Sequence, residues 1–226
     1  MADLRALRAE VESIGSGMRS KAFGVADLEA LKVKHPELLK RVPGDYSRAL
    51  VFGFRLQKAV LRDIVDAPTP LYFQHYRQVN YQLDRIALAV GDYLQDKDFE
   101  SLAIPASQTI SRNPMTGHVS HRLLAHAAGI GFIGRHGLVV HPRYGAQMRY
   151  VSVLTDAPVE PDSPHRGDCG SCRACISACP AGAVKERKEE FDLEACYRQL
   201  SEFTRLPFIG QHVCGVCIKA CSGMED

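Results

Sequence analysis

The chain has 226 residues, of which 46% are hydrophobic and 24% charged, which is typical of a soluble globular protein. Its 28 basic and 26 acidic residues leave a formal net charge of +2, which argues against the strongly basic surface of a nucleic-acid-binding protein. No apolar run reaches the roughly eighteen residues of a membrane span, and the start has neither a signal core nor a twin-arginine motif. We therefore expect a cytoplasmic protein with neither membrane nor nucleic acid as a partner.

The first part of the chain predicts helices and one buried strand. Apolar residues recur at helical spacing over residues 3–16 and, more weakly, after Asp27. Residues 49–54 form an unbroken apolar run, which is typical of a buried strand. The longest helical pattern runs from Tyr76 to Leu94 and predicts one buried face over about five turns.

Several polar residues around this long helix are candidates for binding a cofactor. Tyr72, His75, Tyr76 and Asn80 lie near its start, where polar aromatic groups could point into a pocket. The alternative is that they are core or surface residues whose polar groups already have partners. Ser111 opens a Ser-Arg-Asn-Pro stretch that predicts a loop.

Three glycines, Gly129, Gly131 and Gly134, match the dinucleotide-binding pattern Gly-x-Gly-x-x-Gly. That pattern works only between a strand and a following helix, because the helix N-terminus must face the pyrophosphate. Here the order is reversed, since residues 119–128 predict a helix and residues 137–141 a strand. We therefore expect glycines that let the backbone pass close to a packed element or a flat ligand, with Gly129 in a left-handed conformation.

A strand is predicted at residues 149–156, followed by a linker. Prolines and acidic residues gather over positions 158–168, and we place the domain boundary there. The expected fold class is α+β, with an N-terminal domain over residues 1–157 and a C-terminal domain over residues 158–226.

All eight cysteines lie in the C-terminal domain. From Cys169 to Pro180 they follow Cys-x2-Cys-x2-Cys-x3-Cys-Pro, the spacing of bacterial ferredoxins in which the fourth thiolate binds a second 4Fe–4S cluster. A repeat of this motif would open at position 211, which is Gln211, so we infer that Cys196 replaces that ligand from a separate loop. The predicted ligands are Cys169, Cys172, Cys175 and Cys221 for cluster one, and Cys179, Cys196, Cys214 and Cys217 for cluster two.

Two other uses of these cysteines account for less of the pattern. A zinc ribbon could take its two Cys-x2-Cys pairs from Cys169/Cys172 and Cys214/Cys217, but it would leave four cysteines idle. A disulfide framework needs an oxidising compartment, and the chain shows no signal peptide. Two 4Fe–4S clusters use every cysteine.

Further recognisable segments accompany the cysteines: residues 121–138, 144–145, 154–157, 169–180 and 196–221, with a fainter echo over residues 23–27 and 76–83. Together they resemble epoxyqueuosine reductases and, more distantly, reductive dehalogenases. The resemblance implies an N-terminal α/β sandwich-like domain of the cobalamin-reductase type and a C-terminal ferredoxin-like module. It also implies a base-off cobalamin between them, which the protein positions and which receives single electrons from the clusters.

Carried onto this chain, the resemblance implies that the loop Ser111–His118 and the three glycines line the corrin and its nucleotide tail, within a binding region over residues 72–135. Tyr76 and Asn80 lie in that region too. The proton-donating aspartate of the queuosine enzymes, in an Asp-x-x-Pro motif, is matched here by Met115, with His118 at the proline position. His118 or His121 could substitute as the proton donor, or both could be surface or structural histidines.

Two further departures concern the end of the chain. It stops at Asp226, without the C-terminal helical domain that longer relatives use around tRNA, so tRNA is not the expected substrate. Ser222 stands where a proline usually follows the last cluster cysteine, which leaves the shape of that loop open.

Three hypotheses for the function follow. The first is a reductase that takes electrons from a donor such as ferredoxin or flavodoxin and reduces a small-molecule substrate through two 4Fe–4S clusters and cobalamin. The second is an electron-transfer or corrinoid-handling protein that serves a corrinoid partner protein and has no substrate of its own. The third is that the N-terminal domain holds a flavin, or no cofactor.

Overall fold

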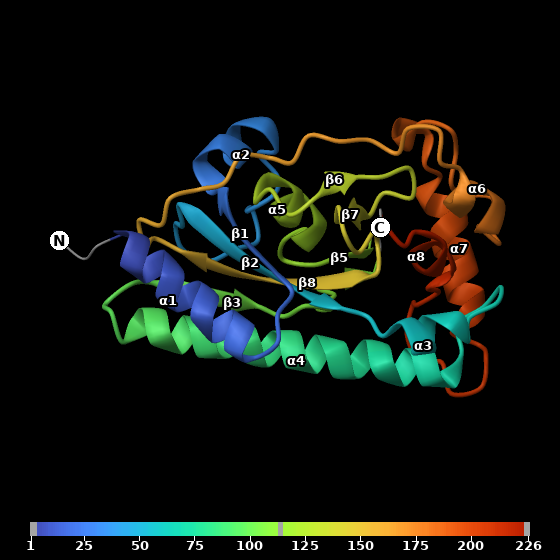
Figure 1. The fold of residues 1–226 in the computed structure, drawn as a ribbon, viewed down its shortest axis with the longest axis horizontal. Coiled ribbons are helices and arrows are strands. Elements are labelled where there is room, and N and C mark those ends of the chain that lie inside the picture. The colour runs from blue at the N-terminus through green and yellow to red at the C-terminus, as the bar shows by residue number, and fades with distance from the viewer. Residues whose placement is uncertain (1–3, 113–114, 224–226) are drawn as a thin grey trace. The chain divides into compact units, whose positions relative to one another are not determined.

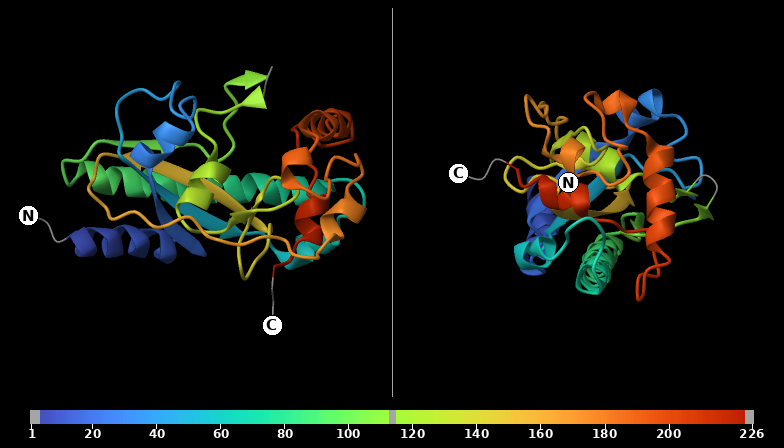
Figure 2. Two further views of the ribbon diagram at one scale, coloured as in Figure 1. Left: turned by 90° about the horizontal axis from the view of Figure 1, so that it is seen from above. Right: turned by 90° about the vertical axis from the view of Figure 1, so that its right-hand side faces the viewer.

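The computed structural model describes residues 4–112 and 115–223 (Figures 1 and 2). Within them the chain packs into two units, each built from three separate segments. Unit 1 comprises Met1–Phe54, Asn80–Ile130 and Arg149–His165, and unit 2 comprises Arg55–Val79, Gly131–Met148 and Arg166–Asp226. The domain boundary predicted between residues 157 and 158 stays a prediction.

Unit 1 is built on a four-stranded sheet with the order β1-β2-β8-β3. Strand β1 (Ala22–Asp27) pairs antiparallel with β2 (Arg48–Arg55), and β3 (Ser101–Ile104) pairs antiparallel with β8 (Met148–Thr155). Four consecutive residues of β2, from Ala49 to Phe52, are fully buried. Since neighbouring side chains on a strand point to opposite faces, both faces of the sheet are covered, as the apolar run predicts.

Helices cover the two faces of this sheet. On one face the rings of Phe23 and Phe52 have centroids 5.0 Å apart and planes tilted by 32°, and a Cβ atom at Gly15 of helix α1 (Leu4–Gly17) would meet the Phe52 ring at 2.4 Å. On the other face a Cβ at Gly24 would meet the carbonyl oxygen of Ala128, directly after helix α5 (His121–Ala127), at 2.1 Å. Helices α1 and α5 therefore lie on opposite sides of the sheet (Figure 1).

The long predicted helix is α4 (Pro70–Gln95), which begins earlier than its apolar pattern because proline is well suited to a first helical position. Its buried stripe includes Leu83, Ile86, Val90 and Leu94, none of them exposed. No helix in the described residues is both long enough and apolar enough to span a membrane.

Most of the other predicted elements of unit 1 are confirmed. The helix after Asp27 is α2 (Leu28–Lys34), and the Asp27 carboxylate accepts hydrogen bonds from the N–H groups of Glu29 and Ala30. Gly129 is left-handed, with φ +72°. The predicted loop at Ser111 is instead a short hairpin of β4 (Ser111–Arg112) and β5 (Met115–Thr116), and its residues 113–114 lie outside the described part.

Unit 2 consists mostly of short elements. Strands β6 (Phe132–Ile133) and β7 (Val139–Val140) form a small antiparallel pair, and β7 lies within the strand predicted at residues 137–141. Its other elements are α3 (Lys58–Arg62), the first turns of α4, α6 (Ala174–Ala178), the 3-10 helix η1 (Lys188–Glu190), α7 (Leu193–Phe203) and α8 (Val216–Ala220).

Candidate metal centre

Two cysteine segments of unit 2 fold in the same way. Each places one cysteine inside a one-turn helix, Cys175 in α6 and Cys217 in α8, and another directly after it. The N–H groups of these following cysteines, Cys179 and Cys221, donate to the third residue before them at 3.3 Å in both segments. Helices α6 and α8 pack against each other, so the two segments form a paired arrangement.

The first group of thiols gathers around Cys175. Burial first, and then the charges of three neighbouring cysteines, raise the pKa of Cys175 to about 11. Burial also raises the pKa of Cys221, and two of the same neighbours add to that shift. This group is Cys169, Cys172, Cys175 and Cys221.

The second group gathers around Cys217, the thiol whose pKa is raised most, first by burial and then by neighbouring thiolates. Burial raises the pKa of Cys214 to about 11, with contributions from Cys196 and Cys179. The pKa of Cys196 is also raised by burial and by Cys179. Cys175 contributes to the shift at Cys217 as well, so the two groups are neighbours.

Cys196 reaches the second group from helix α7. The Asp192 carboxylate caps this helix by accepting from the Ala195 N–H at 2.8 Å. Next to Cys196, the ring of Tyr197 stacks on His212 with centroids 5.0 Å apart and planes 3° apart. This stack ties α7 to the segment just before Cys214, where a regular second motif would have its first cysteine.

The chemistry of these eight side chains fits iron–sulfur clusters. None of them is in a disulfide. Among the described residues, no three His, Cys, Asp or Glu side chains are placed to hold a single metal ion. A 4Fe–4S cluster makes a different demand, because each of its thiolates binds a separate iron atom.

The glycine motif packs mainly against protein backbone. A Cβ at Gly129 would meet the Ser163 carbonyl oxygen at 2.7 Å, and one at Gly131 would meet that of Val140 at 2.3 Å. At Gly134 a Cβ would lie 3.1 Å from the His136 ring and 3.4 Å from the sulfur of Cys169. The motif therefore brings backbone close to a packed element and, at Gly134, to the first group of thiols.

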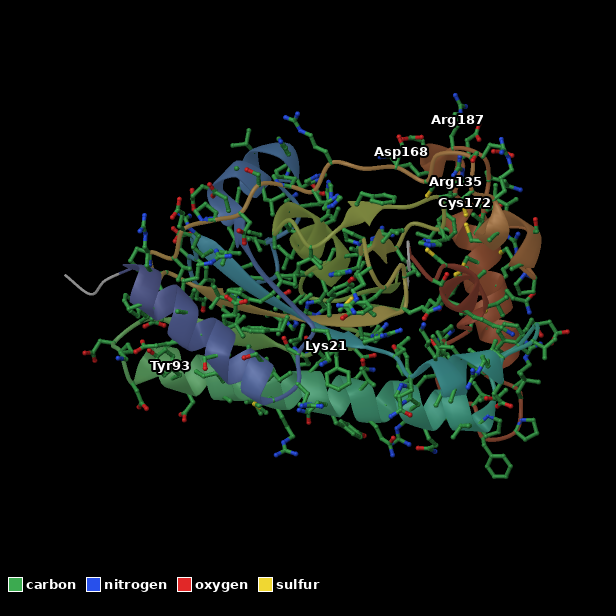
Figure 3. All side chains as sticks on the ribbon, in the orientation of Figure 1. Lys21, Tyr93, Arg135, Asp168, Cys172 and Arg187 are labelled. Carbon is green, nitrogen blue, oxygen red and sulfur yellow. The ribbon has the colours of Figure 1, made fainter. Side chains whose placement is uncertain are left out.

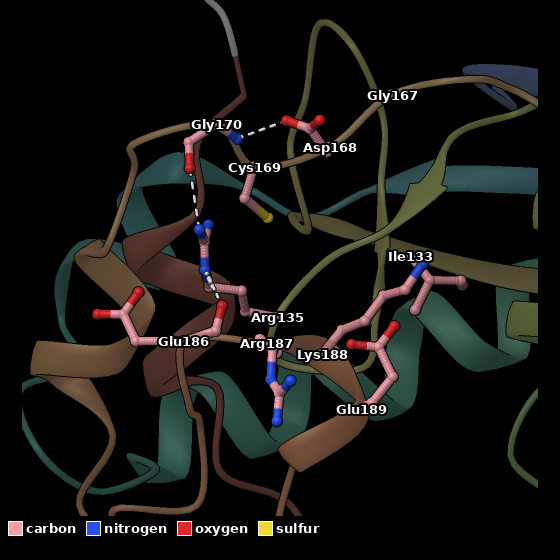
Figure 4. A pocket seen from close by; sticks show the side chains of 10 residues that line it. All are labelled: Ile133, Arg135, Gly167, Asp168, Cys169, Gly170, Glu186, Arg187, Lys188 and Glu189. Atoms are coloured by element: carbon pink, nitrogen blue, oxygen red, sulfur yellow. Dashed lines mark hydrogen bonds between the residues drawn. The ribbon is translucent and has the colours of Figure 1, made fainter.

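Two features next to the first group were not predicted from the sequence. His136 is buried, which lowers its pKa to about 4, and its Nδ1 accepts from the Leu138 N–H at 3.1 Å. Its proton therefore sits on Nε2. A cavity of about 340 Å³ lies beside Cys169 and is lined by Arg135 and residues 186–189, among others (Figure 4).

Of the polar residues near the start of α4, His75 and Asn80 bond to other protein groups. Tyr72 is fully buried, and the buried His75 accepts a hydrogen bond from the Gln57 N–H at 3.1 Å through its Nε2. Burial lowers the pKa of His75. Asn80 accepts from Arg149 Nε at 3.1 Å, while Tyr76 is partly exposed.

In unit 1, both predicted histidines contact the loop that follows β3. His118 Nδ1 bonds to the Gln108 side chain, and His121 Nε2 donates to the Pro105 carbonyl at 3.1 Å. In the same loop, Arg149 donates to the Ala106 carbonyl, and the Asp84 carboxylate accepts from the Ala106 N–H. The sequence had not singled out Arg149 or Asp84 as contacts of this loop.

His121 has both ring nitrogens occupied. Its Nδ1 accepts from the Ser152 hydroxyl at 2.9 Å, because Nε2 must carry the proton that it donates to Pro105. Burial lowers the pKa of His121 to about 4, so the ring is neutral at pH 7. These contacts favour a structural role for His121.

This arrangement predicts a loss of stability in mild acid. The unfolded chain binds a proton at His121 near pH 6.5 and the folded chain only near pH 4, so stability falls as the pH drops between these values. The contribution of His121 to this loss between pH 7.5 and pH 5 is about 2 kcal/mol. Urea unfolding at both pH values should show that His121→Gln reduces the pH dependence by this amount. An equal pH dependence in both proteins would contradict the assignment.

Comparison with known proteins finds sequence similarity over part of the chain and similarity of fold over most of it. No protein-family model matches the chain. It is 42% identical over 69 residues to the epoxyqueuosine reductase of Bacillus subtilis (strain 168), which is 30% of this chain and 18% of that protein. It is 41% identical over 103 residues to the enzyme of Staphylococcus aureus, 46% of this chain and 24% of the relative. These matches span a quarter or less of the curated relatives.

Two solved structures share the fold over nearly the whole chain. A crystal structure of epoxyqueuosine reductase with a tRNA-Tyr stem loop has a TM-score of 0.60 at 22% identity, covering 97% of this chain and 65% of that one. The catabolic reductive dehalogenase NpRdhA has a TM-score of 0.72 at 16% identity, covering 93% and 31%. The predicted resemblance is confirmed: the chain is similar in sequence, over part of its length, to epoxyqueuosine reductases and shares a mixed α/β fold with them and with reductive dehalogenases.

Proposed function

We propose that this chain is an iron–sulfur oxidoreductase that relays single electrons through two 4Fe–4S clusters to a base-off cobalamin. The observation that carries the proposal is the grouping of eight unbridged thiols into two neighbouring sets of four in unit 2. The proposed ligand sets are those inferred from cysteine spacing, and sequence similarity to epoxyqueuosine reductases supports the reaction class.

The electrostatics of the thiols support cluster binding. Without a metal, ionised cysteines in one group repel each other in a partly buried site, and their raised pKa values keep them protonated at neutral pH. Iron offsets this repulsion, so cluster assembly releases protons and stabilises unit 2. When bound, each cluster takes up and gives off one electron at a time.

The cobalamin part of the proposal rests on the shared fold. One neighbouring structure, a reductive dehalogenase with a TM-score of 0.71 at 17% identity, is described as suggesting a mechanism for B12-dependent dehalogenation. By extension to this chain, a corrinoid would supply a cobalt centre that accepts electrons from the clusters. We propose that Tyr76, Asn80, Ser111 and the glycines Gly129, Gly131 and Gly134 contribute to its binding.

His118 is our candidate for the proton donor. His121 is less suited, because both of its nitrogens already bond to protein groups and its pKa is low. His118 has one nitrogen on the Gln108 side chain and is partly exposed. The catalytic loop of the Bacillus subtilis epoxyqueuosine reductase is named after an aspartate, and the resemblance matches that aspartate with Met115 of this chain.

We propose a small molecule as substrate, a ferredoxin or flavodoxin as electron donor, and the cytoplasm as location. The near-neutral charge of +2 supports the choice of a small molecule over tRNA. The methionine that replaces the catalytic aspartate favours an alternative function. In this alternative the protein reduces cobalamin for a corrinoid partner protein and has no substrate of its own.

The proposal is tested by anaerobic reconstitution with iron and sulfide. We expect about eight iron atoms per chain and an EPR signal from reduced 4Fe–4S clusters. Hydroxocobalamin is then added, and a base-off cob(II)alamin band should appear on reduction with dithionite. An unchanged free-cobalamin spectrum would remove the corrinoid part, and a colourless, iron-free protein would remove the whole proposal.

Turnover assays separate the two functions. Reduction of a halogenated phenol, an epoxide or an epoxyqueuosine-containing tRNA stem loop would establish that the protein is an enzyme. If the tRNA stem loop alone were reduced, our choice of a small molecule as substrate would be wrong. Cobalamin reduction without any substrate turnover would favour the corrinoid-handling function.

A further inference from the structure

Arg135, which directly follows Gly134, is bonded to the loop of the first cysteine group (Figures 3 and 4). Its Nε donates to the Glu186 carbonyl oxygen at 2.7 Å. One terminal nitrogen donates to the Cys172 carbonyl at 2.9 Å and the other to the Gly170 carbonyl at 2.9 Å. All three acceptors are main-chain atoms, so one side chain fixes the backbone on both sides of Ser171.

The loop is open to solvent. Gly170, Ser171 and Cys172 are all exposed, and the cavity beside Cys169 lies next to them. Gly170 is left-handed, with φ +48°, and its N–H is held by the Asp168 carboxylate at 2.6 Å. Two arginines join this loop to the Glu186 segment: Arg173 pairs with the Glu186 carboxylate at 2.7 Å, and the guanidinium of Arg135, with its rigid fork of donors, binds the backbone.

The bonds to Arg135 also determine where two N–H groups point. In a trans peptide the C=O and N–H point in opposite directions. Since the carbonyls of Gly170 and Cys172 point at Arg135, the N–H groups of Ser171 and Arg173 point away from it. Neither N–H has a protein acceptor within residues 4–112 and 115–223. They are available as donors to a ligand on the far side of the loop.

We propose that Arg135 is a positioning residue for cluster one. By holding the two carbonyls, it directs the Ser171 and Arg173 N–H groups toward the sulfur atoms of the cluster. Hydrogen bonds to sulfur and nearby positive charge both favour the reduced cluster, which carries one more negative charge. Arg135 thereby raises the reduction potential of cluster one. This inference rests on the proposed function, because it requires a cluster at the first cysteine group.

The test compares two substitutions with a control. Arg135→Gln removes both the charge and the fork, whereas Arg135→Lys keeps the charge but cannot reproduce three hydrogen bonds in one plane. Arg205→Gln is the control, because Arg205 is an exposed arginine of unit 2 that pairs with Glu202. Each protein is loaded with iron and sulfide, and its clusters are titrated electrochemically with EPR detection. The cluster-one signal is the one that persists when Cys196 is replaced by alanine.

In Arg135→Gln we expect the ratio of reduced to oxidised cluster one, at a fixed potential, to fall by roughly tenfold, which is about 59 mV for a one-electron couple. Arg135→Lys should give a smaller decrease, and cluster two and the control should be unchanged. Selective loss of about four irons from Arg135→Gln would also support the inference. Wild-type cluster content and potentials in both Arg135 variants would overturn it and leave the proposed function standing. An iron-free wild-type protein would reject the proposed function itself.

Discussion

Replacing Cys196 by alanine should reduce the iron content of the reconstituted protein from about eight to about four atoms per chain. Cys196 contributes to the electrostatic shifts of both Cys214 and Cys217, so it belongs to the second thiol group. A 4Fe–4S cluster with three cysteine ligands is labile, whereas the first group keeps all four of its thiols. The expected EPR spectrum is therefore that of a single cluster, measured after dithionite reduction under anaerobic conditions.

Glu194→Ala provides the matched control for this substitution. Glu194 lies two residues away on the same helix, is exposed and pairs with Arg198 at 2.7 Å. Its loss should leave the iron content at about eight per chain. The ligand assignment would be wrong if Cys196→Ala also retained about eight irons. It would also be wrong if, in the Cys196→Ala background, the surviving cluster were lost on replacing Cys214 but kept on replacing Cys169.

The cysteine-bearing segments could be recognised because their spacing is local, whereas the assignment of Cys196 and Cys221 to particular clusters stays a prediction. A cysteine every third residue, followed by one turn of helix and a further cysteine, fixes how a loop presents its thiols, and this pattern can be counted in the sequence. The long helix could be predicted from its regular apolar periodicity, strand β2 from its unbroken apolar run and strand β8 from its apolar residues. The left-handed Gly129 followed from its place after a helix.

The parts that could not be predicted depend on contacts between distant segments. Arg135 donates to carbonyl groups 35, 37 and 51 positions away, and its local sequence does not indicate these contacts. The partners of His121 lie 16 and 31 positions away, so the sequence could not decide between proton donor and structural histidine. The assembly of each unit from three separate segments could not be predicted either, because it depends on contacts between distant residues rather than on local composition.

Gly145→Ala is expected to destabilise unit 2 and to disturb the first thiol group. Gly145 is left-handed, with φ +56°, and a Cβ there would lie 2.2 Å from the Cys221 carbonyl oxygen and 2.3 Å from the Gly223 nitrogen. Both contacts are with backbone, so no side-chain rotation can relieve them. The left-handed conformation costs an alanine roughly 1–2 kcal/mol and overpacking adds roughly 1–3, which predicts a decrease of about 2–5 kcal/mol in the free energy of unfolding.

The segment that must shift in Gly145→Ala contains Cys221, which gives this prediction a second measurement. The Ala146 N–H donates to the Cys221 carbonyl at 3.0 Å, so a displacement at residue 145 moves a proposed ligand of cluster one. We expect iron to fall below eight atoms per chain, with the EPR signal of cluster one lost before that of cluster two. Gly210→Ala is the control, because Gly210 has no positive φ and a Cβ there meets nothing within 4 Å. Equal melting temperatures and equal iron contents in the two variants would show that the close approach of Gly145 to Cys221 does not hold cluster one.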